Sequence, residues 1–236
     1  MLSIKSPFRN IPIKVDKKQA VFLDGMRHAV QILSFAYERL NNDLWHIAND
    51  RNIIERNGGF TSVFLDSWAF VDAVDRFRLL WALQPSIDTL PSDFSVDRIS
   101  EKLKNIREVR NVADHVAQKI EQIVAMNASV LGEIKWISFF EDTPLKVKAC
   151  VIRPGVTIKD LNMRFDLPER EIFSLHKSTR IVISAGKHTA NLTEAYETVA
   201  SVVRYAEGSL ERAFDRIGTE SCYPSDFFTE AELETR

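Results

Sequence analysis

The sequence predicts a mainly α protein: an antiparallel helical bundle with a small antiparallel β element between its third and last long helices. Four long stretches repeat apolar residues at three- and four-residue steps, which is typical of helices that bury one face. Before the last of them, two runs rich in β-branched and aromatic residues flank the short connection Glu141–Pro144, as in a β-hairpin. We expect a 1–15 arm, one domain over 16–218 with a β insertion at about 129–186, and an acidic flexible tail over 219–236.

Composition is that of an ordinary globular protein. The chain has 236 residues, of which 45% are hydrophobic and 27% charged, and its net charge is −2. This charge argues against a large basic face for nucleic acid, although it is compatible with RNA cleavage at a small local site. Two distant cysteines, Cys150 and Cys222, are too few for a disulfide framework and favour a reducing cytoplasm. No signal peptide or membrane span is predicted.

The first two helices differ in their apolar pattern. The first is predicted from about Asp16, a good N-cap, to Asp50, with a single core-facing stripe. The second, from Thr61 to Gln84, is apolar on nearly every side, as expected at a bundle centre or a dimer interface. Its charged residues therefore need partners, and Asp72 can pair with Arg76 at i,i+4. Alternatively, one of these two residues faces a cavity shared with the third helix.

The third helix is predicted from Ser95 to about Met126, without an internal breaker. Strands are predicted at Leu131–Phe140 and Leu145–Ile152, with a third at Arg180–Ser184.

The chain then forms a last helix. It is predicted over Leu192–Ile217, with Asn191 or Thr193 as its N-cap.

The third helix carries the one compact group of residues with chemistry to offer, within the stretch REVRNVADHVAQK: Arg107, Arg110, Asn111, Asp114 and His115. An arginine can hold a phosphate, and a histidine can move a proton near neutral pH. Arg and His recur at a similar spacing three times in the chain, at Arg39/His46, Arg110/His115 and Arg170/His176. Only the middle pair has an Asn directly after the Arg and lies on a long predicted helix.

The stretch RNVADH resembles the RNxxxH motif of the HEPN superfamily. FLDSWAFVDAVDRFR, one helix earlier, is similar to the FLDAW…VD…R helix of HEPN-like proteins, and LGEIKW is similar to a Gly-x-Leu/Ile-x-Trp turn found there. The resemblance covers roughly residues 60–140. It implies a helical bundle that often dimerises, and many members are metal-independent RNases of toxin, defence or RNA-processing systems.

The resemblance marks Arg110, Asn111 and His115 as catalytic residues of an endoribonuclease. RNA supplies its own nucleophile, the 2′-hydroxyl. His115 would act as the acid/base, Arg110 would hold the scissile phosphate, and Asn111 would orient either group. No metal and no cofactor is expected. The expected partners are a second copy of the chain, RNA, and an unidentified protein antitoxin or regulator.

The helical wheel separates these residues. Positions five apart differ by about 140° on a straight helix, so Arg110 and His115 lie on different sides. Arg107, Asn111 and His115 align at i, i+4 and i+8, which makes Arg107 a candidate substrate-binding residue. The alternative is that Arg110 pairs with Asp114 and His115 is merely solvated. The chain would then be a non-catalytic HEPN-like module for dimerisation or for binding a nucleotide or partner.

Overall fold

The computed structural model describes residues 1–50, 60–84, 90–115, 118, 121, 123, 129–142, 145–154, 177–218, 221–224 and 226–230. Its helices are α1 (Lys17–Asn49), α3 (Thr61–Ala82), the 3-10 helix η1 (Ser92–Phe94), α4 (Val96–Lys102), α5 (Lys104–Asp114) and α7 (Leu192–Ile217). Its strands are β1 (Glu133–Asp142), β2 (Leu145–Ile152), β3 (Ser178–Ala185) and β4 (His188–Asn191). The prediction of a mainly α protein with a small antiparallel sheet is confirmed.

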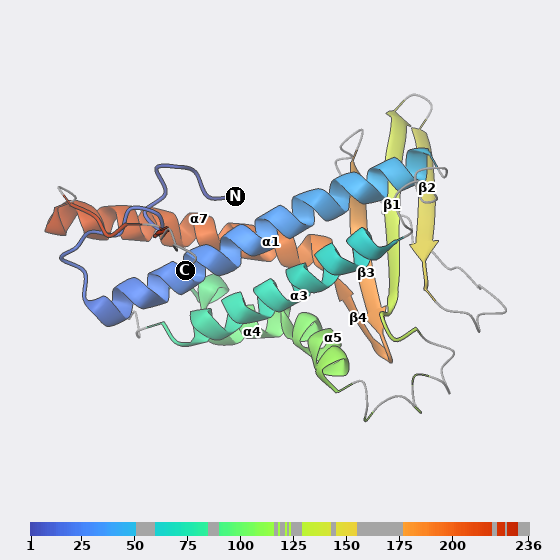
Figure 1. The fold of residues 1–236 in the computed structure, drawn as a ribbon, viewed down its shortest axis with the longest axis horizontal. Coiled ribbons are helices and arrows are strands. Elements are labelled where there is room, and N and C mark those ends of the chain that lie inside the picture. Colours follow the sequence, from blue (N-terminus) through green and yellow to red (C-terminus); the bar gives the residue numbers. More distant parts are fainter. Residues whose placement is uncertain are drawn as a thin grey trace, which may run out of the picture.

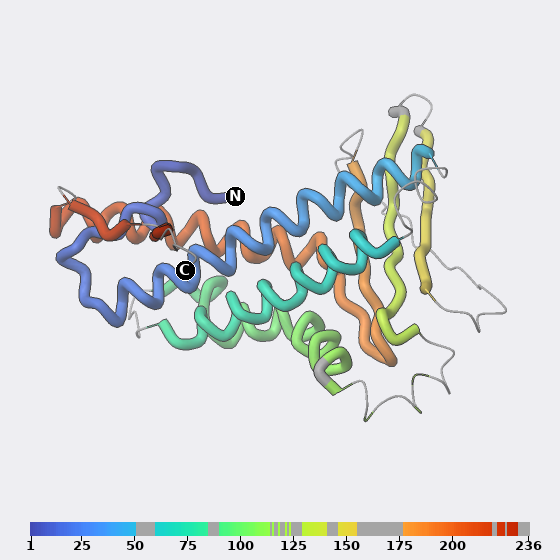
Figure 2. Tube along the Cα trace, in the orientation of Figure 1, coloured from blue at the N-terminus to red at the C-terminus, as the bar shows by residue number. Residues whose placement is uncertain are grey.

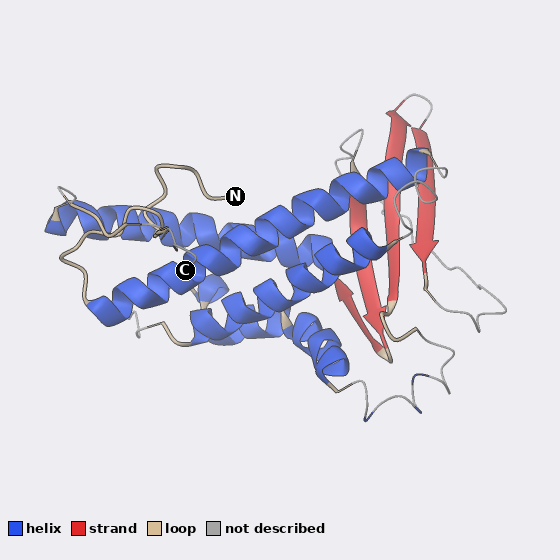
Figure 3. Ribbon diagram, viewed as in Figure 1, coloured by secondary structure: helices blue, strands red, loops and turns tan. Residues whose placement is uncertain are grey.

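The three long helices lie alongside one another, and the sheet stands at one end of them (Figures 1 and 3). α1 runs antiparallel to both α3 and α7 (Figure 1). The sheet has the order β2-β1-β3-β4, with every neighbouring pair antiparallel. Among the described residues, no helix is long and apolar enough to cross a membrane.

One continuous hydrophobic core joins the helices to the sheet. Its fully buried members come from the helices and from the inner face of β1 and β3, and they include Leu33, Leu40, Phe70, Val74, Phe77, Val109, Val199, Val202, Ile134 and Ile183. The apolar stripes of the sequence therefore meet where they were predicted to be buried. Two leucines of α3, Leu65 and Leu79, and its C-cap Leu83 are exposed.

Local sequence sets the ends of the long helices. The Asp16 side chain accepts hydrogen bonds from the backbone N–H groups of Lys18 and Gln19, as expected of an N-cap. Asn191 caps α7 in the same way. The predicted hairpin is confirmed as β1 paired with β2.

The third helix was predicted wrongly as one uninterrupted element. It breaks at Leu103, which is fully buried and separates α4 from α5. α4 packs on α3 and α7, whereas α5 packs on α3, β3 and β4, so one straight helix could not reach both sets of neighbours. α5 then ends at Asp114, and most of the predicted continuation to Met126 lies outside the described residues.

Two further differences concern the sheet and the chain ends. β4 was not predicted, since His-Thr-Ala-Asn has little β propensity and becomes a strand by pairing with β3. The arm is irregular as expected, but Phe8, Ile11 and Val15 on it are buried in the core.

The tail, predicted to be flexible, contacts the arm at the end of the bundle away from the sheet. Pro12 and Cys222 form a β-bridge, and the Tyr223 N–H donates to the Ile11 carbonyl at 2.8 Å.

Candidate functional site

α5 places the predicted motif between α3 and the sheet (Figure 2). Its apolar stripe, Ile106, Val109 and Val112, is buried. The residues with chemistry consequently lie on the remaining sides of the helix. Because α5 ends at Asp114, the last residue of the motif, His115, lies at the C-terminus of the helix.

Arg110 is held by two carboxylates of α3. Its Nε lies 3.1 Å from Asp72 Oδ1, and its Nη1 donates to Asp75 Oδ2 at 2.8 Å. The Asp75 side chain is only 4% exposed, and that of Arg110 is 29% exposed. A guanidinium held by two carboxylates has lost much of its capacity to bind a phosphate.

Two more arginines of α3 complete this arrangement, which we name the α3–α5 ion-pair network (Asp72, Asp75, Arg76, Arg78 and Arg110). Arg76 Nε donates to Asp72 Oδ2 at 2.6 Å, which confirms the predicted i,i+4 pair. Arg78 Nε donates to Asp75 Oδ1 at 2.8 Å. The network thus fastens α5 to α3. The alternative partner of Arg110, the Asp114 side chain, lies outside the described residues.

Arg107, Asn111 and His115 are exposed. Their i, i+4, i+8 spacing places them on one side of α5, which we name the α5 polar face. His115 is the C-cap of the helix, and its backbone N–H donates to the Val112 carbonyl. Arg107, Asn111 and His115 are thus exposed along α5, while Arg110 points to α3. This is the separation that the helical wheel indicated.

Sequence reasoning missed a histidine beside this face. His188 begins β4, and its Nδ1 lies 3.2 Å from Oε2 of Glu108 on α5. The adjoining turn also touches α5, since a Cβ added to Gly186 would lie 3.6 Å from Val112 Cγ1. The two partners are 80 positions apart in the sequence, and no acidic residue stands at a recognised interval from His188. Only the packing of β4 on α5 reveals the pair.

The end of the sheet nearest to α5 also carries basic side chains that already have partners. Arg153 and Lys135 both pair with the buried carboxylate of Glu133. Their contribution to a positive surface is therefore reduced. Within the described ranges, no group of three or more His, Cys, Asp or Glu side chains is arranged to hold a metal ion.

Comparison of the chain with models of protein families, with curated proteins and with solved structures found no match.

Proposed function

We propose that the chain is a metal-independent endoribonuclease of the HEPN type that acts through the α5 polar face. The observation that carries the proposal is the common exposure of Arg107, Asn111 and His115 on one side of a helix that is firmly seated. These three side chains supply a forked cation, an amide and an imidazole.

Each side chain has a role that its position supports. His115, at the helix end, takes the proton of the RNA 2′-hydroxyl or protonates the leaving oxygen. Arg107 binds the scissile phosphate in place of Arg110, whose charge is used by Asp72 and Asp75. Asn111 lies one turn from each and orients the phosphate or the imidazole. Arg110 then contributes by fixing α5 on α3.

The proposal includes a homodimer. A single exposed helix face gives little shelter from water, and a second copy of the chain would enclose the phosphate and supply a second set of side chains. The exposed leucines Leu65 and Leu79 of α3 are candidates for such contact. Light scattering coupled to size-exclusion chromatography measures the mass of the particle. A role in a toxin or defence system, with a protein regulator, belongs to the same proposal.

The test is cleavage of a mixed RNA substrate in EDTA by the wild type and by His115→Ala, Arg107→Ala and Arg110→Ala. We expect His115→Ala and Arg107→Ala to lose activity by about 100-fold or more while remaining as stable as the wild type, because both side chains are exposed. Products ending in a 2′,3′-cyclic phosphate would confirm attack by the 2′-hydroxyl. Unchanged activity in both variants rejects the assignment of these residues.

A second candidate function is a non-catalytic HEPN-like module that binds a nucleotide or a partner protein. The engagement of Arg110 by Asp72 and Asp75 favours it, since the motif arginine then has a structural role. Absence of cleavage by the wild type, as a monomer and as a dimer, would select this candidate. RNA binding without cleavage, measured by fluorescence anisotropy, would identify RNA as the ligand of such a module.

A further inference from the structure

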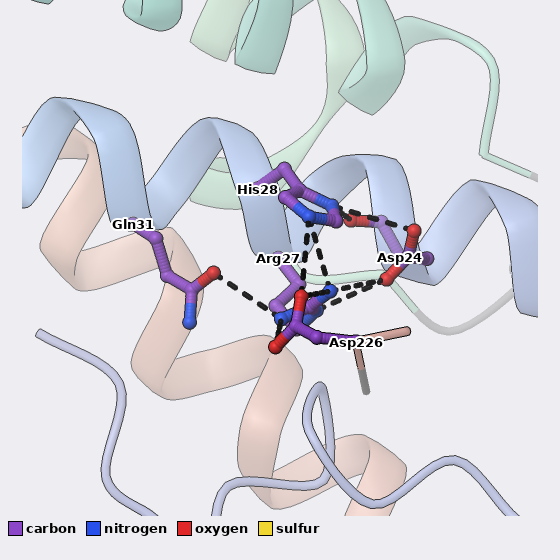
Figure 4. A network of polar contacts seen from close by, with 5 residues as sticks. All are labelled: Asp24, Arg27, His28, Gln31 and Asp226. Atoms are coloured by element: carbon purple, nitrogen blue, oxygen red, sulfur yellow. Dashed lines mark hydrogen bonds and ion pairs between the residues drawn. The ribbon is translucent and has the colours of Figure 1, made fainter. Parts of the chain in front are cut away.

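A second polar cluster lies at the opposite end of the bundle, around Arg27 of α1 (Figure 4). The Arg27 side chain is only 2% exposed, and its neighbours along the helix, Met26 and Val30, belong to the core. Its Nε and Nη2 donate to Asp24 Oδ1 at 3.0 and 2.8 Å. A buried guanidinium of this kind requires anionic partners, and Asp24 satisfies only one side of it.

The other side of Arg27 faces the carboxylate of Asp226, which comes from the C-terminal tail (Figure 4). Arg27 Nη1 donates to Asp226 Oδ2 at 3.3 Å, and Nη2 donates to Oδ1 at 3.2 Å. The hydrogen bonds from Arg27 lower the pKa of Asp226, and the charges of His28 and Arg9 act in the same direction. The Asp226 side chain is nevertheless 72% exposed, so this anion is held from one side only.

A cavity of about 310 Å³ adjoins the cluster, between the arm, α1 and the tail. Its polar lining includes Arg9, Lys17, Asp24 and Arg27. The Arg9 Nε atom is buried and has no hydrogen-bond partner among the described residues. A buried donor without a partner is costly, and a bound acceptor would satisfy it.

The charge of the cavity is positive. Three cations line it against the single carboxylate of Asp24, and Asp226 balances only one more charge. The remaining walls are apolar or aromatic and include Phe8, Ile11 and Tyr223. The volume exceeds that of a bare oxyanion and falls within the range of sites for small organic ligands.

We propose that this cavity binds a small organic phosphate, with the phosphate between Arg9 and Arg27 and the organic group against Phe8 and Ile11 of the arm. The Asp226 carboxylate competes with that phosphate, because it already accepts hydrogen bonds from the forked donors of Arg27. A ligand that reaches Arg27 displaces Asp226 and so detaches the tail from α1. The proposal is independent of ribonuclease activity, since it concerns the other end of the bundle.

Phenyl phosphate is a suitable probe, titrated into the full-length protein by isothermal calorimetry near pH 7. We expect Asp226→Asn to bind it about tenfold more tightly than the wild type, which corresponds to the loss of one competing charged contact. Arg9→Ala should abolish binding. Arg98→Ala, which removes an exposed arginine of α4, serves as the matched control and should bind as the wild type does.

Two further ligands test the chemical class. Phenol should not bind, because it lacks the anion, and inorganic phosphate should bind more weakly than phenyl phosphate, because it does not reach the apolar walls. Equal affinity of wild type and Asp226→Asn for phenyl phosphate, or retained binding in Arg9→Ala, overturns the proposal. Inorganic phosphate binding as tightly as phenyl phosphate overturns the assignment of an organic ligand.

Discussion

Arg110 and Arg27 are two arginines that each lie between two carboxylates, but at opposite ends of the bundle. The partners of Arg110, Asp72 and Asp75, stand on one rigid helix, and Asp75 is 4% exposed. The partners of Arg27 are 46% and 72% exposed, and Asp226 belongs to the tail. In the pair of Arg110 with Asp75, the carboxylate is the more buried partner. In the pairs of Arg27 with Asp24 and Asp226, the arginine is the buried partner.

The element that supplies the carboxylate decides what an arginine in such an ion pair can do. When both carboxylates belong to one packed helix, they stay beside the arginine as long as the helices remain packed, so the arginine is a structural link. When one carboxylate belongs to an exposed tail, it can return to water with little loss, and another anion can replace it. Arg110 is accordingly the weaker candidate for binding a ligand, although it lies in the sequence motif.

The largest effect on stability is expected from Asp75→Ala. This change leaves Arg78 and Arg110, which are mostly buried, without their shared carboxylate. We expect a loss of about 3 to 4 kcal/mol in the free energy of unfolding, as is usual when one partner of a buried pair is removed. Urea denaturation followed by circular dichroism measures it. Asp72→Ala, at a more exposed position, should cost about 1 kcal/mol, and equal losses in the two variants would contradict the account.

A direct test of the comparison replaces each arginine by methionine, which keeps the apolar stem. Arg110→Met should lose about 1 to 3 kcal/mol, because Oδ2 of the buried Asp75 is left without its donor. Arg27→Met should stay within about 1 kcal/mol of the wild type, because Asp24 and Asp226 are free to hydrate. Thermal unfolding distinguishes the two. A larger loss of stability for Arg27→Met than for Arg110→Met would show that Arg27, not Arg110, is the structural link.

Acidification should release the tail from Arg27. The pKa of Asp226 is lowered from its ordinary value of 3.8, so its contribution to docking is fully present above that pH and is lost as the pH falls through the lowered pKa. Hydrogen exchange of the Tyr223 amide, bonded to the Ile11 carbonyl, reports docking. Asp226→Asn should show at pH 7 the loss of protection, relative to the intrinsic exchange rate of the amide, that the wild type shows only in acid. Identical exchange in both proteins at pH 7 would mean that Asp226 does not hold the tail.

The smallest effect is expected from Arg76→Ala. The Arg76 side chain is largely exposed, and Asp72 keeps its contact with Arg110 after the change. We expect a loss of less than about 0.5 kcal/mol in the free energy of unfolding, the usual value for an exposed i,i+4 pair. A loss comparable with that of Arg110→Met would show that the network acts as one unit.

Much of the fold follows from local patterns. The bounds predicted for the first, second and last helices agree with α1, α3 and α7, because apolar periodicity and capping residues act over a few neighbouring positions. The hairpin was recognised for the same reason. The break at Leu103 was not, since each half of that segment is helical by itself and only the positions of α7 and the sheet require a bend. β4 likewise depends on a partner strand.

The motif around α5 shows the same division. Helical geometry fixes the angles between nearby residues, so the spacing alone indicates that Arg107, Asn111 and His115 lie on one side of a helix and Arg110 lies off it. The contacts of Arg110 with Asp72 and Asp75, of His188 with Glu108, and of Asp226 with Arg27 arise from the packing of separate elements. These pairs join residues between 35 and 199 positions apart, and the packing of whole elements brings them together. Spacing within one segment cannot encode such contacts, because they depend on how the segments pack.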